Sequence, residues 1–222
     1  MKRLQQIDEL SLPDHFYIHK DDECYFIMSY TSGKDYTYSE ENNLISNLKK
    51  DMDKKGKPEW KYKQQAISTC AKYLKEVNIL KALSKDITLV PIPPSKAKGD
   101  PAYDDRLSQI LHEAFGNDID IRDLILQKES TQSVHSSDEK RNPDKIADNY
   151  EINESQSKDV KKCIVIFDDI LTTGAHYKAA ESVLSKKFPN NQIKGLFIAR
   201  RVFDRSEENG DIDIFKLNIR LK

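Results

Sequence analysis

The chain has 222 residues, and its 36 lysines and arginines nearly balance its 37 aspartates and glutamates. This balance lacks the basic excess that is typical of nucleic-acid-binding domains. No apolar run approaches the roughly 18 residues of a membrane span, and the first residues lack the apolar core of a signal peptide. We therefore expect a cytoplasmic protein without a membrane partner. The 7 glycines, about half the usual frequency, exclude the glycine-rich nucleotide-binding motifs.

Residues 1–60 have the pattern of a small unit separate from the rest. Residues 16–18 and 24–28 are short apolar runs that predict strands, joined by a polar turn. A helix is predicted around residues 43–50, before a loop that contains lysine, glycine and proline. From Tyr62 onward, apolar side chains recur at helical spacing, which predicts a helix of about four turns with one buried face.

The remainder alternates between strand-like and helix-like patterns. The run 163–167 is continuously apolar, as in a strand buried on both faces of a parallel sheet. Predicted strands cover residues 87–90, 119–121, 124–126, 163–167 and 193–199, and predicted helices cover residues 104–115 and the segment after Gly174. This alternation predicts an α/β fold with a mostly parallel central sheet flanked by helices.

Two adjacent carboxylates, Asp168 and Asp169, follow the run 163–167. Ligands of parallel sheets bind beyond the carboxyl ends of the strands, so we expect both side chains to face the ligand. Carboxylates accept hydrogen bonds from paired sugar hydroxyls and also hold hydrated divalent cations.

A phosphate cradle is predicted directly after the acid pair. Thr172 and Thr173 supply hydroxyl donors, Gly174 permits a close backbone approach, and a helix start follows with free N–H groups. A ribose phosphate, with a diol at one end and a 5′-phosphate at the other, matches this layout. The alternative is ordinary loop and N-cap chemistry without a ligand.

The string Asp168-Asp169-Ile-Leu-Thr-Thr-Gly174 resembles the phosphoribosyl diphosphate (PRPP) motif of type I phosphoribosyltransferases. The resemblance implies that the acid pair holds the ribose hydroxyls. It also implies that the 5′-phosphate is bound by Thr172, Thr173, Gly174, Ala175 and His176. His176 stands where the family commonly has threonine or serine. Its imidazole can still donate to a phosphate, or it can be a half-exposed residue of the first helical turn.

A loop stiffened by prolines follows residues 87–90. The string Val90-Pro91-Ile92-Pro93, with Arg106 and Gln109 after it, is similar to the ComF-like branch of the same family. The resemblance implies that the diphosphate is bound by Pro94, Ser95, Lys96 and Arg106. The alternative is a plain proline turn with solvated lysines.

Residues 127–145 are polar and too long for an ordinary connection. They resemble the mobile loop of ComF-like proteins through Lys128, Thr131, Gln132, Arg141 and Asn142. Such a loop would close over PRPP and exclude water. The alternative is a solvated, charged loop.

The residue pattern divides the chain into a small, hood-like strand and helix unit over residues 1–60, a core over 61–202 and a C-terminal strand extension over 203–222. The resemblance implies that the core is phosphoribosyltransferase-like. The extension alternates like a strand at residues 211–220, which the family pattern does not require. We expect a transferase of the glycosyltransferase class that binds PRPP with Mg²⁺. The ion would reach Asp168 and Asp169 through PRPP and water rather than through direct protein ligands. The 5-phosphoribosyl group would pass to an unidentified acceptor, with release of diphosphate, and the chain could work as a homodimer.

Two other functions remain open on the sequence. One is a regulatory module that senses PRPP or a ribose-phosphate nucleotide without turnover, in DNA uptake or defence. The other, weaker one is a phosphatase-like Asp-Asp site, which would need further acids at strand ends.

Overall fold

The structure is a computed structural model that describes residues 3–131 and 142–204. A six-stranded sheet has the order β1-β2-β8-β7-β3-β4, and all neighbouring pairs are parallel except β1 with β2. Its strands are β1 (Gln5–Gln6), β2 (Cys24–Ser32), β3 (Ile87–Pro91), β4 (Asp120–Ile121), β7 (Cys163–Leu171) and β8 (Gln192–Phe203). A separate antiparallel pair consists of β5 (Ile125–Gln127) and β6 (Tyr150–Ile152).

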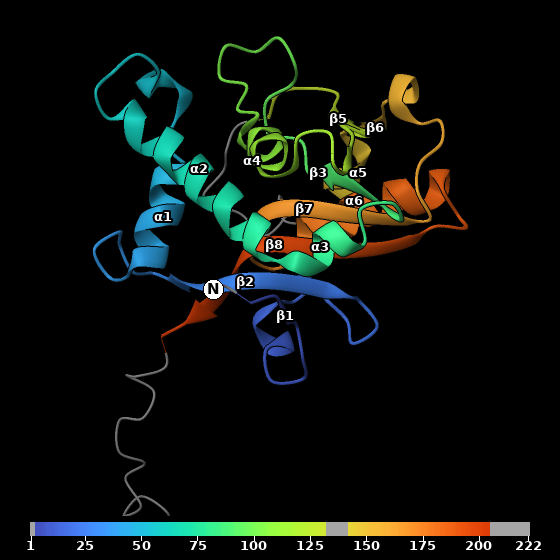
Figure 1. The fold of residues 1–222 in the computed structure, drawn as a ribbon, viewed down its shortest axis with the longest axis horizontal. Helices are drawn as coiled ribbons and strands as arrows, with labels where there is room; N and C mark the ends of the chain where they lie inside the picture. Colours follow the sequence, from blue (N-terminus) through green and yellow to red (C-terminus); the bar gives the residue numbers. More distant parts are fainter. Residues whose placement is uncertain (1–2, 132–141, 205–222) are drawn as a thin grey trace, which may run out of the picture.

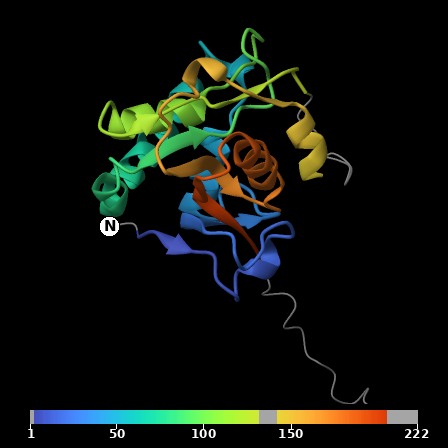
Figure 2. The same cartoon turned by 90° about the vertical axis from the view of Figure 1, so that its right-hand side faces the viewer.

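Helices cover both faces of the sheet (Figures 1 and 2). They are α1 (Glu40–Leu48), α2 (Trp60–Glu76), α3 (Asn78–Ala82), α4 (Arg106–Phe115), α5 (Pro143–Asp148) and α6 (Ala175–Lys187). Figure 2 shows the sheet between α2 and α4 on one side, in green tones, and α6 on the other, in orange. The expected α/β architecture with a mostly parallel sheet is therefore confirmed.

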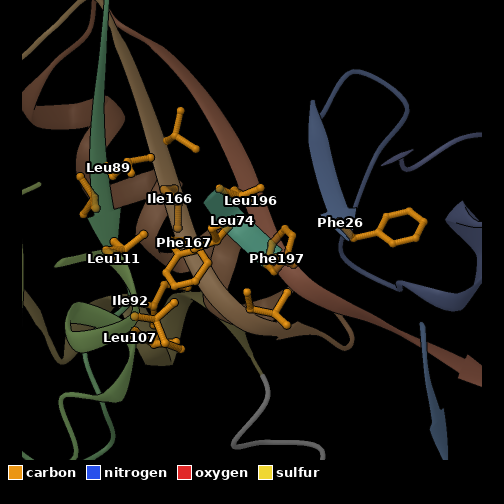
Figure 3. Close-up of a cluster of buried hydrophobic side chains, with 14 of the residues drawn as sticks. Phe26, Leu74, Leu89, Ile92, Leu107, Leu111, Ile166, Phe167, Leu196 and Phe197 are labelled. Carbon is orange, nitrogen blue, oxygen red and sulfur yellow. The ribbon is translucent and has the colours of Figure 1, made fainter. Parts of the chain in front are cut away.

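The core lies on the central strands β3, β7 and β8. Ile164, Ile166 and Phe167 of β7 are 0% exposed, because helices cover both faces of the strand, as its continuous apolar run predicts. Figure 3 shows Phe167 among apolar side chains of neighbouring strands and of α2 and α4. Burial of this cluster fixes the strand that carries the acid pair.

The helices with a clear 3.6-residue period form as predicted. Leu107, Ile110, Leu111, Ala114 and Phe115 form the buried face of α4. Gly116 ends α4 with φ of +54° and donates its N–H to the carbonyl of His112. Within the described residues, no helix combines the length and the apolar character that a membrane crossing requires.

The N-terminal segment differs from its prediction. Residues 24–32, expected in a separate unit, form β2, which pairs in parallel with β8 inside the central sheet. The local pattern predicts the strand but carries no information on its partner, which lies about 170 residues further along the chain. The same expected unit also contains α1 and a 3-10 turn (Met52–Lys54).

Residues 16–18, expected as a strand, form a turn instead. The Tyr17 N–H donates to the carbonyl of Thr173 at 2.8 Å rather than to a neighbouring strand, and the Phe16 side chain is 78% exposed. The predicted strand around residues 211–220 lies outside the described residues, and β8 runs to Phe203.

Candidate functional site

Asp168 and Asp169 both lie in the second half of β7 and line one cavity of about 720 Å³. Successive side chains of a strand point to opposite faces of its sheet. Asp169 therefore extends toward α4 and is 2% exposed, whereas Asp168 extends toward the α6 side and is only partly buried. The structure brings the predicted acids to one cavity but gives them different surroundings.

Asp169 is paired with two cations. Its Oδ2 accepts from Arg106 Nη2 at 2.7 Å and Nε at 3.1 Å, and its Oδ1 lies 3.1 Å from Lys49 Nζ. Burial alone would raise the pKa of Asp169, but the charges of Lys49 and Arg106 outweigh it and hold the pKa well below its usual range. Asp169 is therefore an anion neutralised by the protein itself.

Asp168 has no such partner. Its Oδ1 accepts the backbone N–H of Asp169 at 2.7 Å, and within the described part of the chain its side chain makes no salt bridge. Burial and the neighbouring Asp169 charge raise the pKa of Asp168 to about 7. Asp168 is thus the acid of the pair that can accept a new hydrogen bond from a ligand.

The predicted phosphate loop connects β7 to α6. Gly174 is the N-cap of α6 and has φ of +87°, a conformation that side chains other than glycine rarely adopt. A Cβ at this position would also lie 2.5 Å from Ile18 Cδ1. The first helical bond of α6 runs from the Lys178 N–H to the Gly174 carbonyl, so helix geometry leaves the preceding N–H groups available to an anion.

Residues 15–18 hold this loop through hydrogen bonds to its backbone carbonyls. Besides the bond from Tyr17 to Thr173, His15 Nδ1 lies 2.6 Å from the carbonyl oxygen of Thr172. Since a carbonyl only accepts, Nδ1 is the donor in this pair. Burial lowers the pKa of His15, whose side chain is 1% exposed. This support was missed in the sequence, because nothing local to residues 15–18 indicates a contact with residues 172–174.

His176 occupies the first turn of α6 and lines the cavity. Its Nδ1 lies 3.1 Å from the hydroxyl of Tyr150, a buried residue of β6. The residue is exposed and faces the cavity rather than the core. The imidazole can therefore reach a phosphate that is bound at the start of α6.

The proline loop brings a third predicted group to the same cavity. Pro94, Ser95 and Lys96 follow β3, the immediate neighbour of β7, and line the cavity with the acid pair. The loop is held in place because the Ser95 carbonyl accepts from the Thr131 N–H at 2.8 Å. Arg106, predicted for the diphosphate, also lines the cavity, but its guanidinium is bound to Asp169.

The mobile-loop residues are only partly described. Lys128 Nζ donates to the Asp148 carbonyl at 2.7 Å, and Lys128 does not line the cavity. Gln132 and Arg141 lie outside the described residues.

Lys49 is a cation of the cavity that was not predicted from the sequence. It follows α1 directly and reaches an acid 120 positions later in the chain, a pairing for which a single sequence holds no signal. Over residues 3–131 and 142–204, no three His, Cys, Asp or Glu side chains come together as a set that could hold a metal ion.

In comparisons with known proteins, no protein-family model matches this chain, and no curated protein matches it at the significance required. The function must therefore be inferred from the geometry of the cavity.

Proposed function

We propose that this protein binds PRPP with Mg²⁺ and transfers the 5-phosphoribosyl group to an acceptor, with release of diphosphate. One observation carries the proposal. A carboxylate open to a ligand, a glycine-turned helix start and a proline-stiffened Ser-Lys loop converge from β7, α6 and β3 on one cavity of about 720 Å³. That volume lies within the range of small-molecule sites. The three groups suit, in order, a ribose diol, a phosphate and a second anionic group.

PRPP has this sequence of groups. The Asp168 carboxylate would accept hydrogen bonds from the ribose hydroxyls. Thr172 and the first N–H groups of α6 would bind the 5′-phosphate, with His176 as a further donor. Thr173, also predicted for this phosphate, does not line the cavity. The diphosphate would lie toward Ser95 and Lys96, where Arg106 can turn to it from Asp169.

Mg²⁺ fits this site only as part of a complex with the ligand. Mg²⁺ usually keeps several waters and takes one or two carboxylates together with substrate phosphates. Asp168 offers one carboxylate that is free of salt bridges within the described residues, whereas Asp169 is engaged with Lys49 and Arg106. Bound with the diphosphate, the ion would neutralise negative charge on the leaving group.

The protein would contribute mainly position and charge. In the transfer, the bond from the ribose C1 to diphosphate breaks, its electron pair leaves with the diphosphate, and the acceptor nucleophile bonds to C1. Cations at the diphosphate stabilise the charge that develops there. Asp168 would fix the ribose and place its developing positive charge beside a carboxylate.

Diphosphate release tests the transferase proposal. Purified protein would be incubated with PRPP, Mg²⁺ and a panel of nitrogen bases and amines, and diphosphate would be measured. We expect release that depends on one acceptor and that falls at least tenfold in Asp168→Asn. The matched control is Asp118→Asn, which changes an exposed aspartate outside the cavity.

A second candidate is a module that binds PRPP or a ribose-phosphate nucleotide without turnover. The pairing of Asp169 with Lys49 and Arg106 favours it, since one of the two acids is already neutralised. Thermal stabilisation by PRPP and Mg²⁺ without diphosphate release across the whole panel would support this candidate against the transferase.

A further inference from the structure

Lys63 of α2 has its ammonium group buried, with the side chain 1% exposed. The group donates to the carbonyls of Leu48 at 2.9 Å and Lys50 at 2.8 Å, and to Asp104 Oδ2 at 2.6 Å. A lysine ammonium has three N–H donors. All of them are therefore engaged, two with carbonyls at the end of α1 and one with a carboxylate just before α4.

These contacts belong to a closed ring of charges. Asp104 Oδ2 also accepts from Arg106 Nη1 at 2.9 Å, and Arg106 holds Asp169. Asp169 in turn pairs with Lys49, which lies between the two carbonyls that Lys63 binds. The ring joins three walls of the cavity, namely the end of α1, the start of α4 and the end of β7.

We propose that Lys63 is a positioning residue of the ligand site. Lys63 binds the backbone carbonyls on both sides of Lys49 and the carboxylate of Asp104, which also binds Arg106. These contacts fix the positions of the two cations of the cavity, Lys49 and Arg106. Lys63 does not itself line the cavity, whereas Lys49 lines it with a side chain that is 43% exposed. Lys49 is therefore a further cation for an anionic ligand, and Lys63 acts through it.

The proposal rests on the proposed function for the identity of the anion, the diphosphate group of PRPP. The chemistry needs only an anion. When one arrives, Lys49 and Arg106 can leave Asp169 and bind it, while the contacts of Lys63 keep both cations within reach. Without the buried ammonium, two carbonyls and a carboxylate lose their donor, and the segment that carries Lys49 loses its anchor.

A double-mutant cycle separates this role from a merely structural one. The affinities for inorganic diphosphate with Mg²⁺ and for PRPP with Mg²⁺ would be measured by calorimetry. The variants are Lys63→Met, Lys49→Met and the double variant, with Lys61→Met as the control on the exposed face of α2. We expect each single variant to weaken diphosphate binding about tenfold. The double variant should bind no more weakly than the weaker single one, and the control should bind like the wild type.

Independent losses that multiply in the double variant, or wild-type diphosphate affinity in Lys63→Met, would overturn the proposal. If Lys63→Met does not fold, Lys63→Gln takes its place, because the amide keeps two of the three donors. A partial loss of affinity is then expected, and unchanged affinity overturns the proposal.

The two ligands keep the inferences apart. Binding of diphosphate with the expected cycle but no binding of PRPP would refute the proposed function and leave the role of Lys63 standing. If the Lys63 variants bind PRPP and diphosphate as the wild type does, the role of Lys63 is refuted and the proposed function stands. A wild-type protein that binds neither ligand refutes both.

Discussion

At the residue scale, the two adjacent acids have divided roles. Asp169 is held as an anion by Lys49 and Arg106, and it belongs to the frame of the cavity. Asp168 has no such neutralising partner among the described residues, and its pKa is raised by burial and by the Asp169 charge. A charge kept in this position destabilises the empty fold, as expected for a group retained for ligand binding.

This division predicts a pH-dependent gain in stability for Asp168→Asn. The pKa of Asp168 is raised from 3.8 to about 7, so between these pH values the folded chain keeps a proton that the unfolded chain releases. This group therefore makes wild-type stability fall as pH rises through that window. We expect Asp168→Asn to exceed the wild type by on the order of 2 kcal/mol at pH 8 and by much less at pH 4. Urea unfolding at both pH values measures the difference, and a pH-independent difference would contradict the assignment.

Gly174 yields a second prediction at this scale. Gly174 and Gly33 have similar φ values, +87° and +80°, but an added Cβ meets Ile18 at Gly174 and nothing within 4 Å at Gly33. Gly33→Ala should cost about 1 kcal/mol from backbone strain alone. Gly174→Ala should cost about 1–3 kcal/mol more, because Ile18 must shift. Thermal unfolding of both variants gives the comparison, and equal losses would show that Ile18 does not press on the loop.

At the element scale, helical periodicity predicted α2, α4 and α6, because each helix buries one face. Continuous apolar runs predicted the central strands, because helices cover both faces of those strands. The same periodicity could have predicted that Lys63 is buried. Lys63 precedes Ala66, Ile67 and Cys70 at helical spacing, on the buried face of α2. The strand predicted for residues 16–18 was wrong, since three apolar residues cannot show whether their partner is a strand or the loop at Thr172–Gly174. Contacts between segments more than 150 residues apart in the chain follow only from the tertiary fold.

The support of the phosphate loop by this turn can be tested with His15→Ala. The change removes a buried side chain and the donor to the Thr172 carbonyl. We expect the free energy of unfolding to fall by on the order of 2 kcal/mol, with a weaker PRPP affinity. His19→Ala is the control, because His19 is exposed four residues further on, and it should stay within about 0.5 kcal/mol of the wild type. Equal stabilities of the two variants would argue against the support.

At the scale of the whole molecule, the sheet is assembled from both ends of the chain. β2 pairs with β8 from Cys24 with Gly195 to Ser32 with Phe203, and the segment 15–18 touches the loop after β7. Residues 1–60 therefore supply a strand of the sheet, the support of the phosphate loop and Lys49. The sequence shows the strand itself, but not that it completes the sheet.

A chain without residues 1–60 should consequently fold poorly. Removal of β2 exposes the parallel edge of β8 and its buried side chains, which favours aggregation. Size-exclusion chromatography and thermal melting of residues 61–222 beside the full chain test this. We expect aggregation or a broad transition in the fragment. A monomeric fragment that melts as sharply as the full chain would show that residues 1–60 are an independent unit.

The central claim is that the cavity between β7, α6 and β3 binds PRPP through Asp168. The most direct measurement is a calorimetric titration of PRPP with Mg²⁺ into the wild type, Asp168→Asn and Asp118→Asn. We predict one PRPP per chain for the wild type and for Asp118→Asn, and an affinity at least about tenfold weaker, ~1.4 kcal/mol, for Asp168→Asn. No binding to the wild type, or equal affinity in Asp168→Asn, would contradict the claim.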